Sequence, residues 1–367
     1  MMRSFLAFLC LAFHLCAQGA QPAVASCADA ARAQAAGFDA ALLCATLADF
    51  ATTETNFHAL VIERHGTVVA QAYRRGKDAS IYSLLPWRTS FDASRLHDVR
   101  SISKSVTSLL WGIADGAGKM PALSTPVLDL FPAQRQAGGA GREAITLAHL
   151  FNMRSGLAWN EHMPYTFGND EFGLYWHTSQ ERYVLERPLI AAPGTLFNYN
   201  GGGTALLARV LADRTGMSLR DYARSELFEP LGITEWEWLN DMRGRPLAFA
   251  GLRLRPLDLA KLGRLVLQHG QWQGRQIVPA AWIERTLQSP TPTGDGLDYG
   301  YQWWAGSVDA LGASRRWHGG IGNGGQRLFI VPALDLVVVI TAGDYNQYAI
   351  GASDRELFGK IAAGLRE

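Results

Sequence analysis

The chain has 367 residues and is nearly balanced in charge, with 34 Lys and Arg against 33 Asp and Glu and a formal net charge of +1. This balance excludes a bulk electrostatic attraction to nucleic acid or to an anionic membrane surface, so we expect no nucleic-acid partner. A hydrophobic content of 48% with 18% charged residues is typical of a globular protein, and the length is sufficient for a large core with two subdomains.

The first 25 residues have the pattern of a signal peptide. Arg3 gives a short basic start, Ser4 to Ala17 is almost wholly apolar, and Ala-Val-Ala at residues 23–25 fits a cleavage site. The apolar run is short for a membrane span. We therefore expect residues 1–25 to be removed and the mature protein to be periplasmic or secreted, with no transmembrane segment after the signal. A buried N-terminal helix is the alternative.

Export bears on the four cysteines. Cys10 and Cys16 fall within the signal, which leaves Cys27 and Cys44 in an oxidising compartment, where we expect a Cys27–Cys44 disulfide. Two unpaired buried thiols are one alternative. Lipidation is another, because residues 24–27 have the form of a lipid-attachment box, and a lipoprotein anchored at Cys27 could not form the bridge. The sequence has no CxxC motif or Cys/His cluster, so we expect no metal and no other cofactor.

The N-terminal part of the mature chain predicts a helix followed by a hairpin. Apolar spacing indicates a helix over Phe38–Phe50, and His58–Tyr73 has two β-rich runs around a turn at residues 64–66. Lys77–Leu96 has the composition of a loop. A second helix then begins close to Ser101 and ends near the glycines at residues 116–118.

Ser101 and Lys104 stand three residues apart at the start of that helix, so their side chains share one face. A serine hydroxyl is a weak nucleophile that needs a base beside it. A buried lysine can serve, because desolvation disfavours its charged form and lowers its pKa. A polar first turn with solvated side chains is the alternative for a pair this short.

The middle of the chain predicts mostly helices. The segment Glu161–Ser179 is aromatic and irregular, and it either borders a pocket or caps the core; His149 has the setting of a structural histidine. Helices are expected at residues 127–132, within 144–157 with Thr146 as N-cap, and at 204–214, 218–227, 256–269 and 279–287.

The C-terminal part changes character. Residues 325–332 and 334–340 are rich in Val and Ile and predict adjacent strands, and Asp354–Leu365 predicts a closing helix. Strands at both ends with helices between them predict an α/β (α+β) fold, in which both chain ends build one sheet. We expect a sheet subdomain from residues 26–100 and 240–367 and a helical subdomain from residues 101–239.

Three short elements, in one order, resemble a known family. They are Ser-Ile-Ser-Lys at residues 101–104, Tyr-Asn-Gly at 199–201 and Trp-His-Gly-Gly at 317–320, ahead of a predicted strand at Gln326. The chain resembles the serine hydrolases related to class C β-lactamases, penicillin-binding DD-peptidases, family VIII carboxylesterases and 6-aminohexanoate-dimer hydrolase. The resemblance extends over nearly the whole mature chain and implies the antiparallel sheet and helical subdomain of that fold.

The resemblance implies acyl transfer to Ser101. Lys104 would take or share the serine proton, and Tyr199 would shuttle a proton to the leaving group, its pKa lowered by Lys104. The backbone N–H groups of Ser101 and Ile321 would form the oxyanion hole. His318, Gly319 and Gly320 would contact substrate.

Two departures from the family pattern bear on the substrate. His318 stands where β-lactamases carry lysine, and Gly201 stands where an asparagine often binds an acylamino group. Both favour a small ester or amide over a β-lactam as substrate. We therefore expect an exported esterase or amidase, with a β-lactamase or DD-peptidase as one alternative and a catalytically silent penicillin-binding-like sensor as the other. The oligomeric state is left open.

Overall fold

The computed structural model describes residues 29–83, 85–135, 140–162, 165, 168–288 and 291–367. The predicted signal peptide and Cys27 lie outside these residues. Cys44, in helix α2, is disulfide-bonded, as the cysteine count predicted for it, although its predicted partner is not described. Among the described helices, none is long and apolar enough to cross a membrane.

An eight-stranded antiparallel sheet forms the centre of the described chain, in the order β10-β11-β12-β13-β14-β15-β1-β2. It joins the two chain ends, because β1 pairs with β15 and Ile62 lies opposite Val338. Its strands are β1 (Phe57–Arg64), β2 (Thr67–Tyr73), β10 (Thr291–Pro292), β11 (Asp298–Gly300), β12 (Trp303–Ala310), β13 (Ala313–Gly322), β14 (Gln326–Val331) and β15 (Leu336–Ala342).

The central strands are buried on both faces. Along β15, Val337 and Val339 belong to the hydrophobic core that includes the helices at residues 102–116 and 256–267. Val338 and Ile340 belong to a second core, which includes the helices at residues 40–52 and 350–363. Successive side chains of a strand point to opposite faces, so a strand covered on both faces is apolar at every position. This is why the run at residues 336–342 was recognisable as a strand.

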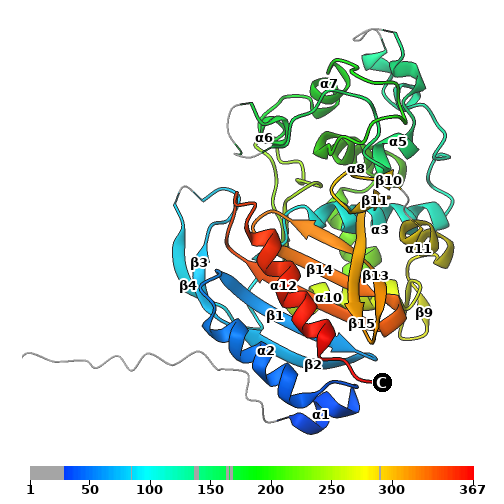
Figure 1. The fold of residues 1–367 in the computed structure, drawn as a ribbon. Coiled ribbons are helices and arrows are strands. Elements are labelled where there is room, and N and C mark those ends of the chain that lie inside the picture. The colour runs from blue at the N-terminus through cyan, green and yellow to red at the C-terminus, as the bar shows by residue number, and fades with distance from the viewer. Residues whose placement is uncertain (1–28, 84, 136–139, 163–164, 166–167, 289–290) are drawn as a thin grey trace, which may run out of the picture.

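Helices cover the two faces of the sheet (Figure 1). Helices α2 and α12 pack together on one face, and α10 and α3 lie against the other. Helices α5, α6, α7 and α8 form the helical part above the sheet edge in that view, whereas α1 lies at the lower end beside α2. The helices are α1 (Ala30–Ala35), α2 (Ala40–Thr52), α3 (Ile102–Gly116), α4 (Val127–Leu130), α5 (Leu147–Phe151), α6 (Asp170–Gly173), α7 (Gln180–Leu185), α8 (Gly201–Thr215), α9 (Leu219–Ala223), α10 (Pro256–Leu267), α11 (Ala280–Leu287) and α12 (Ile350–Ala363).

Local signals explain several helix starts. Thr146 caps α5, where His149 Nδ1 accepts a hydrogen bond from the Thr146 N–H at 3.1 Å, so His149 completes the cap as a structural histidine. Asn200 caps α8 by accepting from the Gly203 N–H at 3.0 Å. This cap starts α8 at Gly201, three residues before the predicted start.

The structure departs from the predicted elements in several places. Residues 77–96 hold part of a hairpin rather than only a loop, and α5 ends at Phe151 well before Gly156. The element at residues 317–320 lies ahead of the strand at Gln326, as predicted, and itself belongs to a strand, β13, that pairs with it. The smaller strands are β3 (Arg75–Asp78) with β4 (Trp87–Ser90), β5 (His97–Asp98) with β7 (Leu252–Leu254) and β6 (Trp236–Trp238), and β8 (Gln271–Trp272) with β9 (Arg275–Gln276).

Candidate active site

Ser101 and Lys104 meet at the first turn of α3, as their spacing predicted. Lys104 Nζ lies 3.1 Å from Ser101 Oγ. The helix is held between the sheet and the helical part, and the Lys104 side chain is 1% exposed. The nucleophile candidate therefore stands at a buried helix N-terminus, whose dipole favours a negative charge developing at Ser101.

Lys104 has two further partners. Its Nζ donates to Glu171 Oε2 at 3.0 Å and to the Phe249 carbonyl oxygen at 3.0 Å. Burial is the largest single influence on the pKa of Lys104 and would lower it, but Glu171, Tyr199 and Glu161 together outweigh burial and the pKa lies above its usual value. The predicted lowering of the Lys104 pKa is therefore wrong, because an ion-pair partner accompanies the lysine into the interior.

A second glutamate lies behind the first. Glu161 Oε1 accepts hydrogen bonds from the Gly201 N–H and from Trp159 Nε1 at 2.7 Å, whereas its Oε2 is buried and has no hydrogen-bond partner among the described residues. Burial, and then the charge of Glu171, raise the pKa of Glu161 well above its usual value. Burial and the charge of Glu171 thus favour the protonated form of the Glu161 carboxyl.

Tyr199 completes the group. Its ring centroid lies 4.9 Å from Lys104 Nζ, and the hydroxyl groups of Tyr199 and Ser101 share a hydrogen bond. Burial raises the pKa of the Tyr199 phenol, and the Lys104 charge opposes this rise without reversing it. The lowering that we predicted is therefore also wrong. Tyr199 rests as a neutral phenol, able to donate and accept within the same contact.

Of these residues, Ser101, Glu161 and Tyr199 line one pocket of about 220 Å³. Ser101, Tyr199 and Ile321 all line it, which places the predicted second oxyanion donor beside the nucleophile. Aromatic side chains form much of the rest of the wall. The other lining residues are Tyr165, Trp304, Gly322, Asn323, Gly324, Arg327, Gln347, Tyr348, Ile350 and Gly351.

The predicted substrate contacts at residues 318–320 are not among the residues that line this pocket. His318 is an interior residue of β13, opposite Ala305 and Ile330, and burial lowers its pKa to about 4. At Gly320 an added Cβ would lie 2.9 Å from the Ile102 side chain. The structure thus gives Gly320 a packing role against α3, and it leaves His318 uncharged at neutral pH.

Gly201 has a different role from the asparagine that it replaces. An added Cβ there would lie 2.6 Å from Glu171 Oε2 and 2.8 Å from Glu161 Oε1. The two carboxyl groups occupy the space beside Gly201 that a side chain would need. This packing strengthens the prediction that an acylamino group is not recognised at this position.

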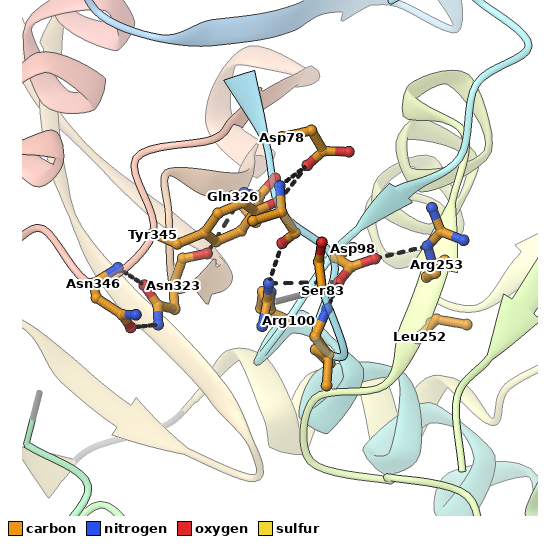
Figure 2. Close-up of polar contacts among 12 residues, drawn as sticks. Asp78, Ser83, Asp98, Arg100, Leu252, Arg253, Asn323, Gln326, Tyr345 and Asn346 are labelled. Atoms are coloured by element: carbon orange, nitrogen blue, oxygen red, sulfur yellow. Dashed lines mark hydrogen bonds and ion pairs between the residues drawn. The ribbon is translucent and has the colours of Figure 1, made fainter. Parts of the chain in front are cut away.

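The turn that leads into Ser101 is held by a polar network (Figure 2). Arg100 has a positive φ of 51° and lies over the Tyr345 ring, its Cζ 4.3 Å from the centroid. Asp98 accepts from the Ile81 N–H at 2.9 Å and pairs with Arg253 at 2.7 Å and with Arg100 at 3.5 Å. Segments distant in sequence therefore fix the backbone on the N-terminal side of the nucleophile.

Sequence reasoning missed Glu161, Glu171 and Arg100. Glu161 and Glu171 lie in the irregular segment that we expected either to border a pocket or to cap the core, and the structure supports the first alternative. No spacing rule relates Glu171 to a lysine 67 residues earlier, so no local signal could have found it. Within the described part of the chain, no group of His, Cys, Asp and Glu side chains is arranged to hold a metal ion.

The sequence matches the beta-lactamase family over residues 50–357. This chain belongs to the beta-lactamase family. A 6-aminohexanoate-dimer hydrolase from Paenarthrobacter ureafaciens is 24% identical over 308 residues, which cover 78% of this chain and 72% of that protein. The family resemblance inferred from three short elements is therefore confirmed, and the chain is a β-lactamase-related hydrolase.

Solved structures show the same fold. A proposed 6-aminohexanoate-dimer hydrolase from Bacillus anthracis has a TM-score of 0.70 at 20% identity, covering 84% of this chain and 79% of that one. A penicillin-binding protein from Bacillus halodurans has a TM-score of 0.62 at 17% identity, covering 86% of this chain and 100% of that one. The predicted β-lactamase and penicillin-binding-protein fold, with its antiparallel sheet and flanking helices, is confirmed.

Proposed function

We propose that this protein is an exported serine hydrolase that forms an acyl-enzyme on Ser101 and acts on a small ester or amide. The observation that carries the proposal is the contact between Ser101 Oγ and Lys104 Nζ at 3.1 Å, beside Tyr199 in a pocket. A hydroxyl hydrogen-bonded to an amine and a phenol at a helix N-terminus is suited to nucleophilic attack on a carbonyl.

The chemistry follows from the arrangement. Ser101 Oγ attacks the substrate carbonyl, and the backbone N–H groups of Ser101 and Ile321 stabilise the oxyanion. Tyr199 passes a proton to the leaving group and later activates the water that releases the acyl group. Family membership and the hydrolase relative support a hydrolytic reaction.

The pocket favours an uncharged, compact substrate. Tyr165, Tyr199 and Trp304 give it aromatic walls, and Arg327 is already paired with Asp354 at 2.6 Å. With His318 neutral and Gly201 packed against carboxyl groups, a carboxylate-bearing β-lactam with an acylamino side chain loses two of its expected contacts. The two features together favour an esterase or amidase over a β-lactamase or DD-peptidase.

The first test compares the mature protein with Ser101→Ala on p-nitrophenyl acetate and butyrate, with nitrocefin beside them. We expect ester turnover that falls by about 1,000-fold or more in the variant, because the acyl-enzyme cannot form without the hydroxyl. Equal rates in both proteins would refute Ser101 as nucleophile. Rapid nitrocefin turnover would instead identify the protein as a β-lactamase.

Export is tested separately. The full chain, expressed in a Gram-negative host, should appear in the periplasmic fraction or the medium with its N-terminus at or near residue 26. Recovery with the first 25 residues intact in the cytoplasm would contradict export. A lipid-modified Cys27 in the membrane fraction would establish the lipoprotein alternative.

A further inference from the structure

In the resting state, the contacts of Lys104 are those of an ammonium group, which cannot accept a proton. An ammonium group has three N–H donors and no lone pair. Lys104 Nζ has three acceptors around it, Ser101 Oγ at 3.1 Å, Glu171 Oε2 at 3.0 Å and the Phe249 carbonyl oxygen at 3.0 Å. To act as the base for Ser101, this lysine must lose a proton as it gains one.

Only one of those acceptors can receive that proton as a base. The Phe249 carbonyl is an amide oxygen, and Ser101 is the group to be deprotonated. Glu171 is a carboxylate with a side chain 2% exposed, in direct contact with Lys104. A proton transferred to Glu171 neutralises this carboxylate, and the proton from Ser101 restores the Lys104 ammonium, so the site keeps one positive and one negative charge.

We propose that Glu171 is the terminal proton acceptor for Ser101, through Lys104. As Ser101 Oγ attacks, its O–H bond breaks and a new N–H bond forms at Lys104 Nζ, while a different N–H bond of Lys104 breaks and an O–H bond forms at Glu171 Oε2. Lys104 remains an ammonium, Glu171 becomes a neutral acid, and the negative charge passes to the oxyanion. In the reverse transfer Glu171 returns this one proton to Lys104, and Tyr199 accepts a proton from Lys104 as it donates its own to the leaving group. This inference rests on the proposed function, and Glu171 is a positioning residue because it acts through Lys104.

Several titratable groups surround the contact between Lys104 and Glu171. Lys104 faces Glu171, Glu161 and Tyr199. Glu171 is in turn faced by Lys104, by Glu161 and by the phenols of Tyr165, Tyr175 and Tyr199. Glu171 is the carboxylate in direct contact with Lys104, whereas Glu161 Oε1 accepts from the Gly201 N–H and from Trp159 Nε1.

The test follows the reaction of Ser101 itself, which does not require the natural substrate. The rate at which an alkyl fluorophosphonate labels Ser101 is measured from about pH 5 to about pH 9, with p-nitrophenyl ester turnover beside it. The variants are Glu171→Gln, which keeps the shape and removes the carboxylate, and Glu171→Asp, which keeps a carboxylate. Asp258→Asn is the matched control, because it removes another buried, paired carboxylate in α10, away from the pocket.

We expect Glu171→Gln to label Ser101 about 100-fold more slowly at neutral pH, with the low-pH limb of its rate profile displaced, and Glu171→Asp to recover at least about tenfold of that loss. Asp258→Asn should keep the wild-type profile. Labelling of Glu171→Gln within tenfold of wild type, or slow labelling with an unchanged profile and no recovery in Glu171→Asp, would overturn the relay. A wild-type protein that labels at Ser101 and hydrolyses no ester or amide would refute the proposed function and still test the relay.

Discussion

At the scale of single residues, the site depends on charges that are buried together. Lys104 and Glu171 are almost fully enclosed, and each compensates the burial of the other. A buried charge that loses its partner is strongly destabilising, so neither residue is expected to tolerate replacement without structural cost. Gly201 contributes to this arrangement, because a side chain there would occupy the space of the Glu161 and Glu171 carboxyl groups.

The Gly201→Ala variant tests that close approach. The added Cβ would lie 2.6 Å from Glu171 Oε2, so the carboxylate must shift away from Lys104. We expect kcat on p-nitrophenyl esters to fall by about tenfold or more and the free energy of unfolding to fall by about 1–3 kcal/mol. Steady-state kinetics and urea unfolding measure both quantities.

Gly359→Ala is the control for this substitution. Gly359 lies in α12, and an added Cβ there would meet nothing within 4 Å. Because alanine is the better helix former, this variant should be unchanged in activity and slightly more stable. Wild-type kinetics in Gly201→Ala would show that the Glu171 contact is not needed for turnover.

At the scale of elements, the start of α3 is positioned from both sides. On one side the network of Asp98, Arg100 and Arg253 holds the turn before Ser101 (Figure 2). On the other side β13 approaches closely, and at Gly322 an added Cβ would lie 2.4 Å from the Val99 carbonyl oxygen. The helix that carries the nucleophile is therefore fixed by a polar network and by strand packing, neither of which lies within the helix.

Asp98→Ala tests the network. The change leaves Arg100 and Arg253 without their buried carboxylate, so we expect the free energy of unfolding to fall by about 3–5 kcal/mol. Turnover should also fall, because the turn before Ser101 loses its support. Asp129→Ala is the control, since its pair with Arg135 is about half exposed on both sides and should matter by less than about 1 kcal/mol. Equal losses in the two variants would contradict a special role for the network.

At the scale of the whole molecule, the sheet buries histidines that lack a carboxylate partner. His58 in β1 bonds the Lys77 carbonyl oxygen through Nε2 at 2.8 Å, and burial lowers its pKa to about 4. Burial also lowers the pKa of His318 to about 4 and that of His97 well below its usual value. Folding therefore requires these imidazoles to be neutral.

These histidines predict a loss of stability in mild acid. Between their unfolded pKa of 6.5 and a folded pKa of about 4, the unfolded chain binds more protons, so stability falls as the pH falls through that window. His58 and His318 should each contribute on the order of 3 kcal/mol to this loss. Burial raises the pKa of Asp354 from 3.8 to about 6. Between these two pH values the folded chain binds more protons at Asp354 than the unfolded chain, so this residue opposes the loss of stability caused by the histidines.

Urea unfolding across this pH range measures the effect. His58→Gln should reduce the acid-induced loss of unfolding free energy by the contribution expected of His58, on the order of 3 kcal/mol. This holds whatever the effect of the substitution on stability at neutral pH. Gly359→Ala, which removes no titratable group, is the control and should leave the slope nearly unchanged. A wild-type unfolding free energy that stays constant from neutral pH to about pH 4.5 would refute the prediction.

The sequence by itself determined what is local or periodic. The spacing of Ser101 and Lys104 on one helical turn, the Thr146 cap and the apolar runs of β1 and β15 depend on contacts within a few residues or on burial of both strand faces, so the chain displays them directly. The order of three short elements was enough to identify the family.

The tertiary structure alone decided the protonation of the site. Glu171 reaches Lys104 across 67 positions, Asp98 meets Arg253 across β5 and β7, and Glu161 is buried beside Gly201. A pKa depends on which charges share a low-dielectric space, and no periodicity in the chain encodes that. This is why the sequence predicted where Ser101 and Lys104 meet and yet predicted the wrong direction for the Lys104 pKa.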